Sequence, residues 1–222
     1  GDLTERMPLL PAYHLPEPVL RQLRSELKSA ASAAPEDALN LADALWGDAY
    51  LEVRQVSIFL LGHAGVPDPA PILSRLNDWL ASDPEPVLRE SLLNTGTHHL
   101  QTRFPAQWEA WIEALLSRKG LTWNAIGLAG LRASIGSGTP QRLPAVFRML
   151  SPFIQNPQPE LINELKRLIS VLAAQSPTET AYFLKQGLSL SSASGTARLI
   201  RQSLPLFSDE IQEDLKATLK SQ

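Results

Sequence analysis

Residues 35–64 read PEDALNLADALWGDAYLEVRQVSIFLLGHA, and this stretch decides the fold. Its first residue is a proline, which is typical of the start of a helix because the first helical residue needs no N–H donor. Apolar residues then recur three and four positions apart, as they do along one face of a helix. The stretch therefore predicts two consecutive helices, over residues 35–46 and 50–64. The same spacing recurs in Leu20, Leu23 and Leu27 and in Leu161, Leu165, Leu168 and Leu172.

These signals extend along the chain and predict an all-α protein. Most of the 18 prolines stand where a helix would begin, and the alternating apolar runs that are typical of strands are missing. Residues 176–179, SPTE, have the pattern of a capping box, whereas Pro152 falls inside a predicted helix and should kink or end it. We expect helices over residues 16–31, 35–46, 50–64, 70–82, 84–103, 105–118, 121–136, 143–156, 158–175, 177–189, 194–204 and 208–220.

The predicted helix starts recur at a nearly constant spacing. The first helices of successive pairs begin at Pro35, Pro71, Pro105, Pro144 and Pro177, and the second helices begin at Leu51, Pro86, Leu121, Pro159 and Gly195. Both series have a spacing of 33 to 39 residues. Trp46, Trp79 and Trp111 follow a similar period, each late in a first helix, where a large ring can fill the space between neighbouring pairs.

A helix-pair period of this length is typical of an α-solenoid, because each pair cannot cover its own apolar face and stacks on the next pair. We therefore expect a right-handed α-solenoid of five to six helix pairs. Residues 35–207 are predicted to form the repeats. Residues 1–34 are predicted to form an N-terminal extension and capping helix, and residues 208–222 a C-terminal capping helix.

Two aspartate–arginine pairs refine the type of repeat. Asp48 precedes Arg54 by six residues and Asp83 precedes Arg89 by six, each pair across the turn into a second helix. This pattern resembles HEAT repeats, whose turn aspartate and second-helix arginine form a hydrogen-bonded ladder between layers. We therefore expect ladder pairing for Arg54 and Arg89 in preference to ligand contact. The later repeats depart from the pattern, with Arg118 and Asn124, Asn156 and Ile162, and Ser192 and Arg198 at these positions.

A second resemblance covers residues 35–205. Leu45 and Trp46, followed by Tyr50, Glu52, Arg54 and the apolar run 58–62, resemble the Leu-Trp…Glu-x-Arg…apolar pattern of the DNA alkylation repair enzymes, which are HEAT-like glycosylases that excise alkylated purines. The likeness continues in Trp111, in Leu121-Thr122-Trp123, and in residues 125–131 and 177–188. The resemblance implies a distant, degenerate member of that family with DNA as its partner.

The sequence departs from that family where the catalytic acid is expected. The family uses an aspartate four residues after a tryptophan, but Ile112 follows Trp108 at this spacing and Leu115 follows Trp111. An expected arginine partner of Trp123 is also missing, because Asn124 and Ile126 stand at the candidate positions. Without a placed carboxylate, the electrostatic stabilisation that dominates such catalysis is lost. Substitutes for the catalytic groups could be Glu113, Glu109 or Glu52 as the acid, with Trp123 and Trp111 contacting the base.

Other chemistries find little support. The chain has no cysteine, which excludes disulfides and thiolate sites and suits a reducing compartment, so we expect a cytoplasmic location. His98 and His99 are adjacent and point about 100° apart on a helix, so they cannot jointly bind a metal, and we expect His63 to cap a helix end. Residues 134–138, SIGSG, lack a phosphate-loop lysine and are predicted to be a linker. We expect no cofactor, no metal and no membrane partner.

Charge gives the remaining functional signal. The chain has a net charge of -3, yet its predicted second helices hold eight basic and five acidic residues, a balance of +3 that leaves -6 elsewhere. Second helices commonly line the concave face of such solenoids, so we expect a mildly positive inner surface. The residues that we expect to contact a partner are Arg132, Lys166, Arg167, Arg198 and Arg201.

We therefore expect a binding module that engages the backbone of duplex DNA, weakly and in a salt-sensitive manner, or an acidic protein. Two alternatives stay open. One is an active glycosylase on alkylated DNA, which needs no cofactor, and the other is a purely protein-binding scaffold.

Overall fold

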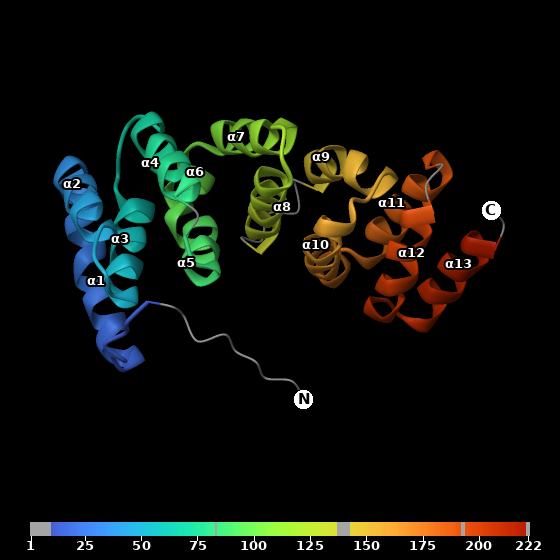
Figure 1. Ribbon diagram of the computed structural model, residues 1–222, viewed down its shortest axis with the longest axis horizontal. Coiled ribbons are helices and arrows are strands. Elements are labelled where there is room, and N and C mark those ends of the chain that lie inside the picture. Colours follow the sequence, from blue (N-terminus) through green and yellow to red (C-terminus); the bar gives the residue numbers. More distant parts are fainter. Residues whose placement is uncertain (1–9, 83, 137–142, 192–193, 221–222) are drawn as a thin grey trace. The chain divides into compact units, whose positions relative to one another are not determined.

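The computed structural model describes residues 10–82, 84–136, 143–191 and 194–220, and most of these residues are helical, with no strand among them (Figure 1). The all-α prediction is therefore confirmed. Asp83, Ser192 and the second half of the predicted 134–138 linker lie outside the described residues. Within the described part, no helix combines the length and the apolar character needed to cross a membrane.

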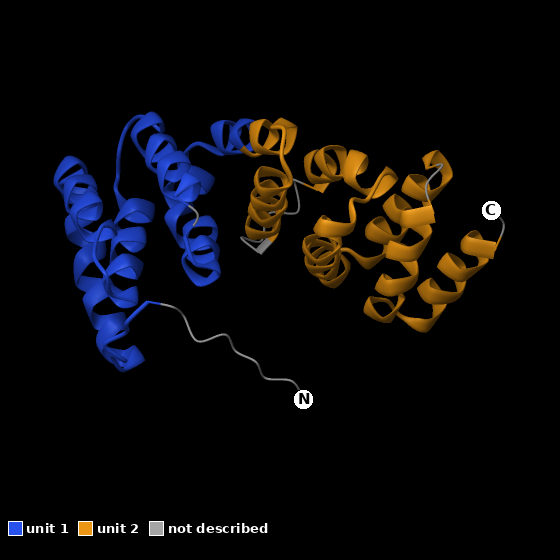
Figure 2. Ribbon diagram, viewed as in Figure 1, with its two compact units in different colours: residues 1–111 blue, residues 112–222 orange. Residues whose placement is uncertain are grey.

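The chain divides into two compact units, residues 1–111 and residues 112–222 (Figure 2). Unit 1 contains α1 (Glu17–Ala33), α2 (Pro35–Trp46), α3 (Leu51–His63), α4 (Ala70–Ala81), α5 (Pro86–Ser91), η1 (Leu92–Gly96) and α6 (His98–Arg103). Helix α7 (Pro105–Ser117) spans the boundary. Unit 2 contains α8 (Leu121–Gly136), α9 (Leu143–Gln155), η3 (Pro159–Leu161), α10 (Ile162–Gln175), α11 (Pro177–Leu190), α12 (Ser194–Ser203), η4 (Leu204–Leu206) and α13 (Asp209–Lys220).

Tryptophans and one ion pair join successive first helices in unit 1. Trp46 of α2 stacks on Trp79 of α4, with ring centroids 4.4 Å apart and planes within 5°. Arg75 of α4 reaches back to Asp43 of α2 and donates two hydrogen bonds, of 2.9 and 2.6 Å, to its carboxylate. The indole of Trp111 in α7 donates a hydrogen bond of 3.0 Å to an α4 amide oxygen. The period of the tryptophans thus places large rings at the contacts of α4 with α2 and α7.

The predicted helix 84–103 is wrong in one respect, because it is interrupted by the π-helical turn η1. The reason lies in α3, where Gly62 lies so close to η1 that an added Cβ would come within 1.9 Å of the Thr95 carbonyl oxygen. A π turn adds a residue to the helical turn and so displaces the local backbone. The hydroxyl of Thr97 donates to the Leu93 carbonyl oxygen and satisfies it inside this buried contact.

The segment before α1 is held against the start of α3. The ring of Tyr13 stacks on Tyr50 with centroids 4.0 Å apart, and the carbonyl oxygen of Pro11 accepts from the Leu51 N–H. The Glu52 carboxylate accepts hydrogen bonds of 3.0 and 2.7 Å from the backbone N–H groups of Tyr13 and His14. Burial alone raises the pKa of Glu52, but these backbone hydrogen bonds outweigh it and leave the pKa below its ordinary value. Glu52 therefore stays ionised as an anchor.

The contacts among the helices of unit 2 divide them into two layers. Helix α10 contacts both α8 and α12, whereas α11 contacts both α9 and α13. The first layer therefore consists of α9, α11 and α13, and the second layer of α8, α10 and α12. The layers meet where α11 packs on α10 and α12. Leu165, Leu168, Ile169 and Leu172 of α10 are all fully or almost fully buried there, which is the apolar face that the sequence predicted.

Two local predictions in unit 2 have different outcomes, because the predicted helix 143–156 is observed as α9, whereas the predicted cap of the next helix is not. Helix α9 does not end at Pro152 but runs on to Gln155, because the proline only removes the N–H of its own residue and its carbonyl still accepts from Asn156. Helix α11 begins at Pro177 as expected, but Ser176 makes no side-chain cap. Its carbonyl oxygen instead accepts from both the N–H and the hydroxyl of Thr180.

Replacing Glu52 by alanine should release residues 10–16 from α3, because two part-buried backbone N–H groups lose a charged acceptor. We expect the free energy of unfolding to fall by about 2–3 kcal/mol and the amides of Tyr13 and His14 to exchange hydrogen faster. Glu113→Ala is the matched control, since this glutamate is exposed and its ion pair with Arg148 spans 3.5 Å at the surface. Unchanged exchange at both amides in Glu52→Ala would contradict the anchoring role.

Candidate functional site

Charge divides unequally between the two units. Residues 1–111 contain 8 lysines and arginines against 15 aspartates and glutamates, a net charge of -7, whereas residues 112–222 contain 12 against 8, a net charge of +4. The whole-chain value of -3 therefore hides a basic unit. An anionic partner would be attracted to unit 2 and repelled by unit 1.

The five predicted contact residues all belong to the second layer of unit 2. Arg132 is on α8, Lys166 and Arg167 are on α10, and Arg198 and Arg201 are on α12. Because α10 packs against both α8 and α12, these helices bring the five cations onto one layer. We call this set of five residues the basic layer. Arg167, Arg198 and Arg201 are exposed, and Arg132 and Lys166 are half-buried.

A pocket of about 450 Å³ opens within the basic layer. Arg132, Lys166 and Arg167 line one part of it, together with Ser170 and Gln202. The remaining lining is apolar and comes from Val171 of α10 and from Pro205 and Leu206 of η4. The sequence therefore identified the cations of this pocket but not its apolar wall.

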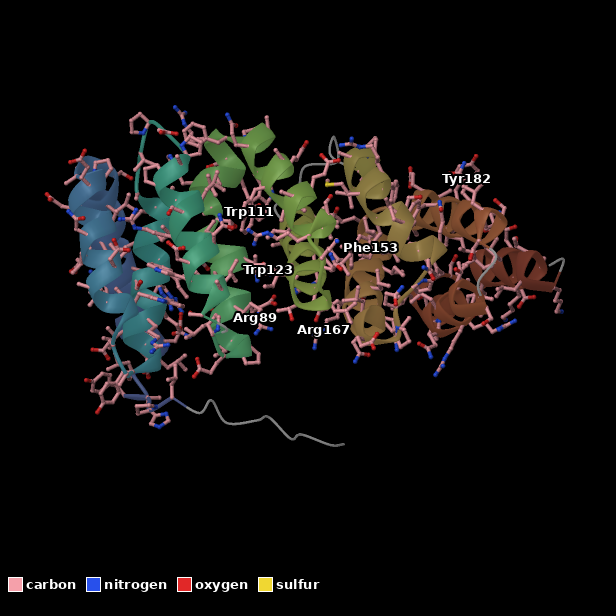
Figure 3. All side chains as sticks on the ribbon, turned by 45° about the horizontal axis from the view of Figure 1, so that its top comes forward. Arg89, Trp111, Trp123, Phe153, Arg167 and Tyr182 are labelled. Atoms are coloured by element: carbon pink, nitrogen blue, oxygen red, sulfur yellow. The ribbon has the colours of Figure 1, made fainter. Side chains whose placement is uncertain are left out.

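Two arginines at the pocket, Arg167 in its lining and Arg198 near its rim, have side chains exposed to solvent. Arg167 extends from α10 (Figure 3) and forms an ion pair of 2.9 Å with Glu164 one turn earlier, with 65% of its side chain still exposed. A surface pair of this kind is worth only a few tenths of a kcal/mol, so it leaves the guanidinium able to exchange partners (about 0.3–0.5 kcal/mol). Arg198 lies one turn before Gln202 on α12, so its side chain neighbours the rim of the pocket.

The expected ladder pair of unit 1 makes a contact of a different kind. Arg54 Nε donates a hydrogen bond of 2.7 Å to the backbone carbonyl of Asp48, not to its carboxylate. The carboxylate accepts from the N–H of Tyr50 instead and so stabilises the turn. The Arg54 guanidinium also lies 5.5 Å from the ring centroid of Trp46. For the second pair, Arg89 donates to the Pro84 carbonyl, and Asp83 lies outside the described residues.

The three candidate acids lie on two helices, with Glu52 on α3 and both Glu109 and Glu113 on α7. Glu52 is 7% exposed and anchors the backbone of residues 13 and 14, and Glu113 is exposed and paired with Arg148. Glu109 is half-buried on the part of α7 that belongs to unit 1. Glu52 and Glu109 lie on different helices. All three carboxylates already interact with another group of the protein.

The two candidate tryptophans have different surroundings. Trp111 is buried, hydrogen-bonded to Asn77, and lies with its ring centroid 5.2 Å from that of Trp108. Trp123 is half-buried at the start of α8, and the Arg118 guanidinium covers one ring face at 4.4 Å from the centroid. Stacking a base on that face would require the displacement of this cation–π contact.

Unit 1 holds a second pocket, of about 520 Å³, at the start of α2. Its polar lining consists of the carboxylates of Glu36, Asp37 and Asp68, and the rest is largely proline and aliphatic. This pocket has the opposite charge to the one in unit 2. Among the described residues, no group of three histidines, aspartates or glutamates is arranged to hold a metal ion.

The histidines form a ring stack in unit 1. His63 of α3 lies between Phe59 and His98 of α6, with centroid distances of 4.1 and 5.0 Å, and its Nδ1 lies 2.9 Å from the Phe59 carbonyl oxygen. The adjacent His99 points elsewhere, toward the Val66 carbonyl oxygen at 3.0 Å. Burial lowers the pKa of both His63 and His98, and the charges of Lys28 and His99 lower both further.

Acidification should therefore destabilise unit 1. The folded pKa values of His63 and His98 lie below the ordinary value of 6.5, so the unfolded chain binds protons more readily than the folded chain does. The contribution of the two neutral histidines to the free energy of unfolding is fully present above about pH 6.5 and is lost as the pH falls below this value. Thermal unfolding between about pH 7.5 and pH 5.5 should show a smaller pH dependence for His98→Gln than for the parent chain. An equal or steeper dependence in the variant would contradict this account of the stack.

The pocket of the basic layer thus combines cationic side chains from α8 and α10 with a cavity that could hold an anionic ligand. Sequence periodicity could not reveal its apolar wall, because Pro205 and Leu206 belong to a 3₁₀ turn that has no repeat equivalent in the pattern. Comparison of the chain with protein families, with curated proteins and with solved structures found no match. The function must therefore be inferred from the residues of this chain.

Proposed function

We propose that the protein is a helical-repeat binding module that engages an anionic macromolecule, the backbone of duplex DNA or an acidic protein, through the basic layer. The observation behind this proposal is the gathering of five cations on α8, α10 and α12, three of them around one pocket. These residues were predicted from their charge and from their position on second helices. The contacts among the three helices support their belonging to one surface.

We further propose that the helix pairs stack as a right-handed HEAT-like solenoid with α8, α10 and α12 on its concave side. The contacts of α10 with α8 and α12, and of α11 with α9 and α13, support this within unit 2. The stacked Trp46 and Trp79 rings support it within unit 1. A relation to the alkylation repair enzymes stays a prediction from the resembling motifs.

A working glycosylase is the less supported alternative. Such an enzyme needs a carboxylate beside the sugar and a tryptophan against the base, with hydrogen-bond distance between the acid and its target. Glu52 already accepts two backbone hydrogen bonds, and Trp111 is buried against α4. Release of 7-methylguanine from methylated DNA, slowed by Glu113→Gln, would favour this alternative over the binding module.

The strength of the proposed binding can be bounded from the number of cations. Each phosphate contact contributes a slope of about -0.9 to the dependence of log affinity on log salt. Three contacts therefore predict a loss of about 40-fold between about 50 and 200 mM salt, and five contacts a loss of about 500-fold. Binding is expected to be weak at physiological salt, because no more than these few cations contribute.

The test is a charge reversal within the basic layer. We expect Lys166→Glu combined with Arg198→Glu to weaken binding of a labelled DNA duplex or of labelled polyglutamate at least tenfold at about 50 mM salt, as measured by fluorescence anisotropy. Lys119→Glu combined with Lys220→Glu is the matched control, since both lysines are exposed and neither lines the pocket.

Two results would contradict the proposal. One is failure of both probes to bind the parent protein at low salt. The other is equal binding by the basic-layer variant and the control, which would favour a scaffold in which the positive charge has no role.

A further inference from the structure

The pocket of the basic layer has two chemically different parts. Arg132, Lys166 and Arg167 supply positive charge, and Val171, Pro205 and Leu206 supply an apolar wall. Leu206 is 39% exposed although it is a large aliphatic residue, and Pro205 is exposed as well. A site that only had to hold phosphate would gain nothing from an exposed aliphatic wall, because ionised oxygens are better solvated by water or by polar groups.

The volume of the pocket also favours an occupant larger than a phosphate group. A volume of about 450 Å³ lies in the range of pockets that hold small organic ligands, which is about 300–1,000 Å³. It is far larger than a single anionic oxygen group requires. The remaining volume borders the apolar wall, so an occupant that fills it must bring apolar atoms together with its negative charge.

We propose that this pocket binds an acidic peptide segment of a partner protein, with one apolar side chain inserted against Val171, Pro205 and Leu206 and flanking carboxylates on the three cations. This inference rests on the proposed function and selects the acidic protein over DNA as the partner. Charge complementarity supplies the attraction, and burial of the apolar side chain supplies the specificity.

The charge of the whole chain also favours a short acidic segment. A long polyanion gains attraction at the basic layer, while the net charge of -7 of unit 1 opposes its contact with that unit. A peptide that contacts only the pocket and its rim avoids most of this repulsion, because charges farther away than about 8–10 Å are screened at physiological salt. The surface of a duplex also offers no flexible apolar side chain to the wall.

The test uses the full chain and two labelled peptides of equal charge. Both have glutamates on either side of a central pair of residues, which is Leu-Phe in the probe and Ser-Ser in the control. We expect the Leu-Phe peptide to bind at least about tenfold more tightly than the Ser-Ser peptide, as one apolar side chain becomes buried. Fluorescence anisotropy at constant salt measures both affinities.

Variants of the protein locate the effect in the pocket. Leu206→Ser should remove most of the difference between the peptides, whereas Leu190→Ser should preserve it, since Leu190 is 70% exposed on α11 and does not line the pocket. Lys166→Glu should weaken the binding of both peptides by the same factor, because both peptides have the same charge. Both leucines are exposed, so both variants are expected to fold. The Ser-Ser peptide tests the role of the apolar side chain without any change to the protein.

The outcomes separate this inference from the proposed function. Equal binding of the two peptides, or a difference that persists in Leu206→Ser, overturns the inference while the function stands. Tighter binding of a DNA duplex than of the Leu-Phe peptide, unaffected by Leu206→Ser, overturns it in favour of DNA. Failure of the peptides, of polyglutamate and of the duplex to bind overturns both.

Discussion

Close approach between neighbouring helices is the constraint on which this structure depends. In unit 1, α3 meets the η1 backbone at Gly62, where any side chain would collide with the Thr95 carbonyl oxygen. In unit 2, an added Cβ at Gly187 of α11 would come within 2.5 Å of the Ile154 side chain of α9. At both places a helix packs against an element that is not adjacent in sequence, α3 against η1 and α11 against α9.

On α10, the residues that pack against neighbouring helices differ from the residues that line the pocket. The side of α10 that faces its neighbours is built from buried leucines, whereas Lys166, Arg167 and Ser170 are on the side that lines the pocket. Because α8 and α12 both pack on α10, their cations lie on neighbouring helices of one layer. The buried face of α10 therefore positions a set of charges that alone contribute little to stability.

Much of the fold could be predicted from the sequence, because prolines mark the helix starts and leucines mark the buried faces. Predicted and observed bounds of α2 and α8 coincide, and those of α12 differ by one residue at the C-terminal end. The π turn η1 could not be predicted, because it results from the contact of residues 92–96 with Gly62, about thirty positions earlier. The same reason applies to Glu52, which the sequence offered as a possible acid and which instead binds two N–H groups 38 and 39 positions before it.

The candidate site was predictable in part. Arg132, Lys166 and Arg167 could be chosen from their charge and their place on second helices, and the structure places them around one pocket. The apolar wall could not be chosen, since an exposed leucine after a helix has no signature in the periodicity. Solvent exposure of Leu206 becomes informative only when its neighbours in space are known.

Hydrogen exchange of Gly62→Ala tests the dependence between neighbouring helices most directly. Gly47→Ala is its control, because a Cβ at Gly47 would meet nothing closer than 4.0 Å. The account predicts that Gly62→Ala lowers the free energy of unfolding by at least about 2 kcal/mol and reduces protection in α3, η1 and α6 together, while Gly47→Ala leaves these helices protected. Loss of protection confined to α3, or an effect no larger than that of Gly47→Ala, would contradict it.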